Sequence, residues 1–595
     1  MSRPPFIRSF SPSRLLLGLR KFLRNDQLIL ALLSLFIGLV GGALVIALRE
    51  AISFFQFSFY GAPGERLYDI VAALPWWHIL AVPTLGGLAV GLLVRYIMPE
   101  GRTQGVADVI EASALKGGRM SLSTGLRAAV VNALSIGSGA SVGREGPAVH
   151  LGASLAGWVA KKLHLSRSLS RTILGCGVAA AVAGSFNAPI AGALFANEVV
   201  IGHYALKAFA PVVIASVTGT AVSRAYYGDF PAFVLPPHEI TSYLEFPAFI
   251  LLGVLAGLVA SFLLRAIFTA QDVAQKIPGP AWLRPGIGGF LIGVIALFLP
   301  QVLGVGYGIT DDALSGSVAL WLLVAVLVGK IVATALSLGF GFGGGIFSPS
   351  LVVGAMLGGA FGIIATGVFP TLHMGTGGYT LIGMGAVAAA TLGAPISTTL
   401  IVFELTGDYE LTMGLMLAVV VSTAITRHIS KNSFFQLQLE RRGLDLKGGF
   451  ESALLRASRV CDVMEENGEL VSPDMPLSQL RVCLQESKLG ELFVIDDEGR
   501  LIGTITLADL SETAFDPAMD MLINAADVAR RKPPMLQCND HLEEALKKIR
   551  GSGEHLIAVV DNQENRKFLG TVEEKHVMSA YNRALLQSRH EERDV

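Results

Sequence analysis

A short glycine-rich segment that ends in proline holds the residues of this sequence that are most able to do chemistry. Gly143, Arg144, Glu145, Gly146 and Pro147 follow one another, and an apolar stretch begins at the proline. Proline is favoured in the first turn of a helix, because its missing N–H would have no partner there. The segment therefore predicts a turn at a helix N-terminus, where unpaired N–H groups and the helix dipole attract an anion. We expect Gly143, Arg144 and Gly146 to contribute to this anion site.

A second segment of the same kind lies about two hundred residues further on. It runs from Gly343 through Ile346 and Phe347 to Pro349. If the two turns face each other, their N–H groups form a cage for an anion. An anion held in this way can leave again quickly, whereas a buried lysine or arginine would bind it too tightly for fast passage.

Glu145 gives the first turn a second property. Its carboxylate is itself an anion, so it can occupy the cage and compete with a transported anion, and protonation would release it. An ionisable residue inside a membrane is a functional candidate by default. We therefore expect Glu145 to be a gate and a candidate proton carrier; the alternative is a salt bridge to Arg144 that neutralises both charges.

The elements around these turns occur twice. The stretch 134–155 aligns without a gap onto 336–357, and 188–198 matches 394–404. Two halves, roughly 27–230 and 245–430, thus share one plan. Interrupted apolar segments at matching positions of two halves indicate a substrate site between the repeats of a transporter. The alternative is two unrelated contacts between small residues.

The composition places most of the chain in lipid. Of its 595 residues, 52% are hydrophobic and 16% are charged, which is too apolar for a soluble protein of this size. We expect roughly ten or more crossings, and the clearest are long apolar runs at 28–48, 75–94, 247–264, 286–300 and 317–338. The arm 1–26 is basic and has no cleavable signal, so the positive-inside rule predicts a cytoplasmic N-terminus.

Isolated polar residues suggest no further chemistry. The four cysteines, Cys176, Cys461, Cys483 and Cys538, contain no CxxC pair, which argues against a metal site or a disulfide framework and favours reducing surroundings. Lys330 stands alone in an apolar run, where a satisfied or snorkelling lysine is expected rather than a pathway charge.

The C-terminal part has a different character. After a linker at 441–458, charged residues appear every few positions from 459 to 582, and two strand–turn–strand patterns lie at 492–505 and 556–572. This pattern predicts a soluble tandem repeat. The last residues, 583–595, form a charged tail, and we expect 586–595 to fray.

Two motifs connect the apolar part with a known family. Gly143 to Pro147 and Gly345 to Pro349 resemble the GREGP and GxFxP signatures of the CLC anion channels and transporters, and Asn187 to Glu198 resembles the helix that follows. The resemblance covers about 27–440. It implies an all-α polytopic fold with two inverted-topology repeats and broken helices, assembled as a homodimer. It also implies chloride bound by the N–H groups of Ile346 and Phe347, with Glu145 as the external gate.

The sequence departs from the family at three positions. Gln104 replaces the serine of the first family motif, and its amide can still donate. Phe435 stands where the family has a tyrosine ligand, so a hydroxyl is missing. Glu198 is a candidate for the proton path, but proton-coupled members carry an acid at the next position, which is Val199 here. A structural role for Glu198 at helix ends is the alternative.

The tail resembles a tandem pair of cystathionine-β-synthase-type (CBS) domains. These α/β modules often bind adenine nucleotides, and Thr506 and Asp509 occupy the positions that contact phosphate and ribose in that family. The second copy has Glu573 and His576 instead. The alternative is a purely structural dimerisation domain.

The sequence thus predicts transport of chloride or a similar anion through a glutamate-gated pathway, with a preference for uncoupled, channel-like conduction. A proton-coupled antiporter and a membrane-anchored nucleotide sensor are the alternatives. An enzyme is not expected, because no nucleophile, paired carboxylate or metal ligand accompanies Glu145. No cofactor is required, an adenine nucleotide is a candidate regulatory ligand, and no feature indicates nucleic acid as a partner.

Overall fold

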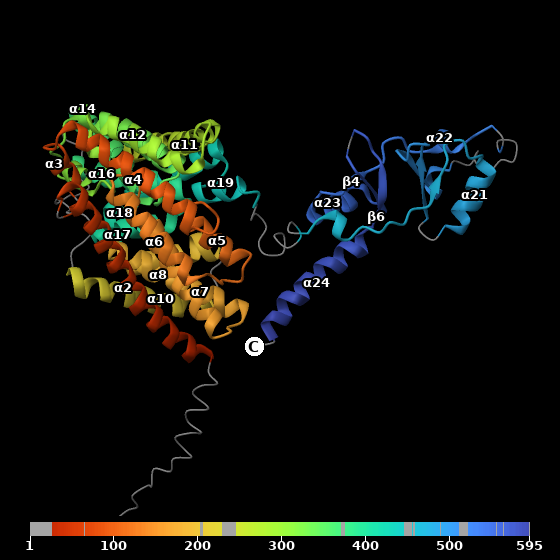
Figure 1. Cartoon of the computed structure of the whole chain (residues 1–595), viewed down its shortest axis with the longest axis horizontal. Coiled ribbons are helices and arrows are strands. Elements are labelled where there is room, and N and C mark those ends of the chain that lie inside the picture. The colour runs from red at the N-terminus through yellow and green to blue at the C-terminus, as the bar shows by residue number, and fades with distance from the viewer. Residues whose placement is uncertain are drawn as a thin grey trace, which may run out of the picture. The chain divides into compact units, whose positions relative to one another are not determined.

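A computed structural model describes this chain from residue 26 to residue 593, except for residues 63, 65, 203–205, 229–244, 370–374, 445–454, 456–457, 488–489, 511–519, 521, 555 and 563. The N-terminal arm and most of the expected linker fall outside the described residues. The chain divides after Leu444 into two compact units (Figure 1). They are described separately below.

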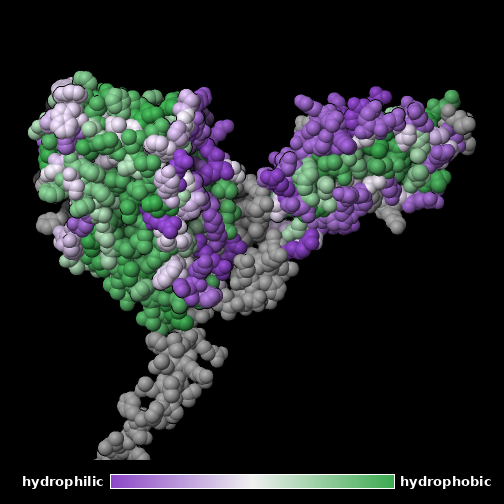
Figure 2. Space-filling view, viewed as in Figure 1, coloured by the Kyte–Doolittle hydropathy of each residue, from purple (hydrophilic) through white to green (hydrophobic). Residues whose placement is uncertain are grey.

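The first unit is a bundle of helices whose surface is largely apolar. Its visible face is mostly hydrophobic, and hydrophilic residues gather along one edge (Figure 2). In order, the helices that matter for the argument are α2 (Asp26–Tyr60), α4 (Trp76–Ile97), α5 (Val106–Ala114), α6 (Leu122–Gly137), α7 (Glu145–Lys162), α8 (Arg167–Phe186), α9 (Pro189–Phe195), α10 (Leu206–Tyr227), α11 (Phe246–Lys276), α12 (Arg284–Ala296), α13 (Tyr307–Leu314), α14 (Leu320–Gly339), α15 (Phe347–Val368), α16 (Thr376–Leu392), α17 (Pro395–Thr406), α18 (Tyr409–Ser430) and α19 (Phe434–Glu440).

Seven helices of the described residues are long and apolar enough to cross a membrane. Four further apolar helices have 10 to 17 residues, shorter than the roughly 20 residues that a full crossing needs. The expectation of ten or more crossings is therefore too high for full spans. The run at 286–300, which was expected to cross the membrane, forms helix α12 of only 13 residues.

The two halves repeat the same sequence of helices and breaks. Helix α6 ends at Gly137 and α7 begins at Glu145, while α14 ends at Gly339 and α15 begins at Phe347. In each half the broken helix packs against the next one, α7 against α8 and α15 against α16, and α9 of the first half contacts α17 of the second. The expected fold class is confirmed: a polytopic helical unit with two repeats and broken helices, followed by an α/β unit.

The second unit contains two copies of a small α/β module. One sheet has the order β1 (Leu470–Val471), β2 (Glu491–Ile495), β3 (Leu501–Thr506), and the other has β4 (Met535–Gln537), β5 (Leu556–Val560), β6 (Phe568–Glu573). Each sheet has one parallel and one antiparallel pair, with a bulge near the end of its middle strand. The amphipathic helices α21 (Leu477–Glu486) and α23 (Leu542–Ser552) cover them. The sequence prediction of a tandem repeat is therefore confirmed.

The two modules share a small hydrophobic core. Phe493 and Leu501 of the first sheet pack with Leu556, Ala558 and Val560 of the second. The last helix, α24 (Glu574–Arg593), continues almost to the end of the chain. The expectation of a frayed end from residue 586 is therefore wrong for the backbone up to Arg593, because this charged stretch is also rich in residues that favour helices.

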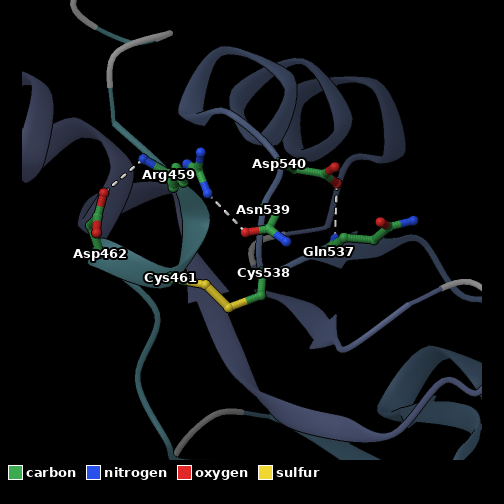
Figure 3. The surroundings of a disulfide bond; sticks show 7 residues. All are labelled: Arg459, Cys461, Asp462, Gln537, Cys538, Asn539 and Asp540. Atoms are coloured by element: carbon green, nitrogen blue, oxygen red, sulfur yellow. Dashed lines mark hydrogen bonds between the residues drawn. A yellow bond between two sulfur atoms is a disulfide. The ribbon is translucent and has the colours of Figure 1, made fainter. Parts of the chain in front are cut away.

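A disulfide in the second unit corrects the sequence interpretation of the cysteines. Cys461 and Cys538 are 77 residues apart in sequence, and their Cα atoms are 4.8 Å apart. Figure 3 shows the bond beside the segment that carries Arg459, whose guanidinium donates to Asn539 at 3.0 Å. The Cys461 N–H donates to the Cys538 carbonyl at 3.1 Å. Spacing along the chain could not reveal this pair, because the fold of the module brings the two segments together.

Candidate functional site

The two glycine-rich turns meet face to face. The N–H of Gly143 donates to the carbonyl of Gly345 at 2.7 Å, and the N–H of Gly345 donates to the carbonyl of Gly143 at the same distance. A Cβ added to Gly345 would lie 2.9 Å from the backbone nitrogen of Gly146, so this close approach requires glycine. The N-termini of α7 and α15 are thus held next to each other, as the sequence predicted.

Each helix begins at its turn with N–H groups that have no partner in the preceding turn. The first helical hydrogen bonds after the turns run from Ala148 to Arg144 and from Ser350 to Ile346. Pro147 and Pro349 have no N–H to satisfy, so they fit these first turns. Two helix dipoles therefore converge on one place, which favours a negative charge there.

Glu145 places such a charge at this point. Its side chain is 1% exposed, and its Oε1 accepts hydrogen bonds from the Ser348 hydroxyl at 2.6 Å and from the Tyr307 hydroxyl at 2.7 Å. Its Oε2 is buried and has no partner among the described residues. The carboxylate is thus held through one oxygen by two hydroxyl donors.

The alternative of a salt bridge between Arg144 and Glu145 is not what the structure shows. Glu145 forms no ion pair with any described residue, and its partners are the two hydroxyl groups. The Arg144 guanidinium instead lies over the ring of Tyr307, with 4.9 Å from its central carbon to the ring centroid. Arg144 therefore contacts the residue that binds Glu145.

A cavity of about 610 Å³ leads to this point. Six of the residues predicted from the sequence line it: Gln104, Glu145, Gly146, Ile346, Phe347 and Phe435. Five arginines line it as well: Arg95, Arg102, Arg284, Arg441 and Arg442. Gly143 and Arg144 adjoin this cavity in the chain but do not line it. Three of these arginines, Arg102, Arg441 and Arg442, are ion-paired with acidic side chains. The cavity wall thus carries cationic groups, which favour small anions over cations.

The loop with Gln104 is held in place by ion pairs. Asp108 accepts a hydrogen bond from the Gly105 N–H at 2.8 Å, and it pairs with Arg102 at 2.6 Å and with Arg442 at 3.0 Å. Because Arg442 directly follows α19, these contacts join the Gln104 loop to the helix that carries Phe435.

Aromatic rings surround the two phenylalanines of the site. The ring of Phe347 lies 4.9 Å from that of Phe186 and 5.9 Å from that of Phe195, centroid to centroid. Phe435 packs edge-on against Phe434 at 5.6 Å. Phe435 therefore presents a phenyl ring and no hydroxyl at the cavity wall.

Glu198 lies at a contact between the two halves and not at the cavity. Its carboxylate accepts hydrogen bonds from the Ile396 N–H at 3.0 Å and from the Ser397 N–H at 2.8 Å. Its repeat mate Glu404 does the same for the Ile190 and Ala191 N–H groups, at 2.9 and 2.7 Å. Each glutamate thus caps the short helix of the other half, α17 or α9.

Sequence reasoning missed three residues of the site. Tyr307 begins α13, far from both motifs, and the glycines around it, Gly304, Gly306 and Gly308, were a usable signal for a turn before a helix. Ser348 stands inside the second motif, where its hydroxyl three residues after Gly345 was a usable signal. Phe195 belongs to α9, which the repeat had indicated, but its ring contact with Phe347 depends on the packing of α9.

In the second unit, Thr506 and Asp509 contact each other. Asp509 accepts hydrogen bonds from the Thr506 N–H at 2.9 Å and from its hydroxyl at 2.7 Å, and it pairs with Arg530 at 3.2 Å. Burial alone would raise the pKa of Asp509, but the bonds from Thr506 and the charge of Arg530 hold it below its usual range. At the matching place in the second module, His576 pairs with Glu465 at 3.1 Å.

Comparison with known proteins identifies the first unit. The family model described as voltage gated chloride channel matches residues 86–427. The chain belongs to the CLC family. The CBS domain model matches the tail of this CLC protein twice, at 460–515 and 525–583.

Individual relatives agree with this assignment. The CLC protein is 35% identical over 397 residues to a putative chloride channel protein ClcB-like of Ralstonia nicotianae, covering 66% of this chain and 92% of the relative. It is 28% identical over 557 residues to chloride channel protein CLC-f of Arabidopsis thaliana, covering 83% and 70%.

Solved structures show the same fold. A slow cyanobacterial Cl⁻/H⁺ antiporter is similar with a TM-score of 0.63 and 22% identity, over 69% of this chain and 97% of the other. A eukaryotic CLC transporter is similar with a TM-score of 0.60 and 18% identity, over 92% and 97%. The chain is therefore an integral, multi-pass anion transport protein of the CLC family with a pair of CBS domains at its C-terminus.

Proposed function

We propose that this protein conducts chloride, or a similar anion, along a pathway through the arginine-lined cavity, with Glu145 as the gate and without obligatory coupling to protons. The observation that carries the proposal is the position of the Glu145 carboxylate. It lies where the N-termini of α7 and α15 meet, and it lines the same cavity as Ile346 and Phe347.

The mechanism follows from competition between two anions. The arginines of the cavity wall concentrate chloride, and the N–H groups of the two turns bind it without a full counter-charge. While the Glu145 carboxylate is ionised, it occupies the place in the cavity where the N-termini of α7 and α15 meet, and it excludes chloride there. When it is protonated, it loses its charge and its attraction to the helix ends, and the pathway opens.

Two features favour uncoupled conduction. Val199 follows Glu198, so the acidic side chain that proton-coupled members carry at this position is missing. Glu198 itself is engaged in capping α17. The alternative is a proton-coupled antiporter with a different inner proton path, and the similarity in fold to a Cl⁻/H⁺ antiporter keeps this alternative open.

Flux from liposomes tests the proposal. Purified protein is reconstituted, the voltage is set with potassium and valinomycin, and chloride efflux and external pH are recorded together. We expect chloride flux without proton movement; uphill proton transport driven by a chloride gradient would establish the antiporter.

Glu145→Gln, which imitates the protonated gate, should conduct as fast as the wild type or faster and should lose its dependence on pH. An unchanged pH dependence would refute the gate.

For the tail, we propose regulation by an adenine nucleotide at Thr506 and Asp509. The CBS family supports this proposal, and the second module, with Glu573 and His576 at the matching positions, does not offer the same groups. Because Asp509 already pairs with Arg530, a nucleotide would have to displace that arginine. A chain that binds nucleotide but moves no anion would favour the membrane-anchored sensor.

We also propose a homodimer with a cytoplasmic N-terminus and a cytoplasmic CBS pair.

A further inference from the structure

Lys330 is a buried charged side chain outside the anion site. It lies on α14 and is fully buried. Its ammonium group donates to the carbonyls of Val302 and Gly304, at 3.0 and 2.8 Å. A buried ammonium group is costly unless its hydrogen bonds are satisfied, and here the acceptors belong to one loop. This loop leads to Tyr307, the residue that binds the gate.

The Lys330 ammonium group also lies close to Gly306, the residue before Tyr307. Gly306 has a φ of +93°, and a Cβ at this position would lie 3.1 Å from the Lys330 ammonium nitrogen. Both the backbone conformation and the space thus require glycine. Lys330 thus contacts both the loop and the glycine that precede α13 and Tyr307.

Side chains on the same face of α14 also bind the turn that leads to Glu145. Residues four and seven positions after Lys330 share its face, and these are Thr334 and Ser337. The Ser141 N–H donates to the Ser337 hydroxyl at 2.9 Å, and the hydroxyls of Ser141 and Thr334 are 3.2 Å apart. Ser141 lies in the turn that leads to Glu145.

The two loops are also bonded to each other. The Gly304 N–H donates to the Gly139 carbonyl at 3.2 Å, and Tyr307 binds Glu145 at 2.7 Å. One polar stripe on α14 thus positions both the gate and its hydroxyl donor, which are 162 residues apart in sequence.

We propose that Tyr307 holds the ionised gate closed and that Lys330 is the positioning residue for Tyr307. This inference rests on the proposed role of Glu145. The Tyr307 hydroxyl stabilises the carboxylate only while the carboxylate occupies the anion site, so it favours the closed state over the open one. A hydrogen bond to a charged group is strong enough that its loss changes such an equilibrium about tenfold or more.

The experiment measures chloride efflux from liposomes at one fixed pH for Tyr307→Phe in two backgrounds, the native chain and Glu145→Ala. We expect Tyr307→Phe to raise flux about tenfold in the native background and to change nothing when Glu145 is replaced by alanine. The matched control is Tyr379→Phe, because Tyr379 is also buried but lies on α16, outside the cavity lining. It should leave flux unchanged in both backgrounds.

Lys330→Met should raise flux in the same direction, and the effect should not add to that of Tyr307→Phe, because both changes release the same contact. Lys330→Arg keeps the charge and the donors, so it should restore most of the native rate. If Lys330→Met yields no folded protein, as judged by size-exclusion chromatography, Tyr307→Phe still tests the role of Tyr307, and a Lys330→Arg variant with flux as high as that of Tyr307→Phe would overturn the role assigned to Lys330.

The outcomes separate the two proposals. If Glu145→Ala leaves flux at the native level, the gate itself is refuted. If Glu145→Ala raises flux but Tyr307→Phe does not, the gate stands and the role of Tyr307 is refuted. An equal effect of Tyr307→Phe in both backgrounds would also overturn it, since the tyrosine would then act on the pathway independently of Glu145.

Discussion

Glu491 of the tail gives a prediction whose size follows from its surroundings. It lies in β2 and is 5% exposed. Burial, and next the charge of Glu554, raise its pKa from an ordinary 4.5 to about 7; Asp509 adds to this effect and Arg530 opposes it. The only cation among these groups is shared, because Arg530 pairs with both Asp509 and Glu554.

The sign of the pH dependence follows from this shift. A carboxyl whose pKa is higher in the folded state than in the unfolded state favours folding when it is protonated. This contribution is fully present below about pH 4.5 and is lost as the pH rises through about 7. The difference between the two pKa values corresponds to about 3 kcal/mol. Glu491→Gln should therefore stabilise the tail by up to about 3 kcal/mol at pH 8 and by almost nothing at pH 4.5.

Amide hydrogen exchange of the full-length protein measures this effect. The slowest amides of β2 and β3 report the opening of the first module, and a gain of about 3 kcal/mol slows their exchange about a hundredfold after correction for the intrinsic rate. Glu486→Gln is the control, because Glu486 is exposed at the end of α21. A gain that is equal at pH 4.5 and pH 8, or a gain in the control, would refute the reasoning.

Three further predictions concern the gate turn and the tail. Gly345→Ala forces a Cβ against the backbone of Gly146 and should lower chloride flux at least about fivefold, since such overpacking costs about 1–3 kcal/mol. Gly367→Ala, on helix α15 but with open space around it, should not lower it. Cys461→Ser removes a disulfide that joins residues 77 positions apart and should destabilise the tail by about 4 kcal/mol. When the denatured protein is reduced, the native chain should gain two maleimide-reactive thiols and the variant should gain none. Asp509→Ala should weaken adenine-nucleotide binding in calorimetry, and equal affinity would exclude Asp509 from the site.

The sequence by itself determined the features of this protein that depend on residues close to one another in the chain. The two motifs place helix starts at Glu145 and Phe347, because a proline in the first turn and glycines before it leave few other conformations. The internal repeat predicts two equivalent halves, since two matched segments occur in the same order, at offsets of 202 and 206 residues. In the tail, the alternation of strand and turn residues was sufficient to predict two modules.

The tertiary structure decided which distant groups meet. Tyr307 donates to Glu145 although 162 residues separate them in the sequence. Glu198 caps a helix of the other half, whereas sequence alone left the role of Glu198 open between proton path and structure. The disulfide between Cys461 and Cys538 was missed for the same reason. Side chains that are far apart in sequence become partners through packing, and the spacing of residues along one chain carries no signal for such contacts.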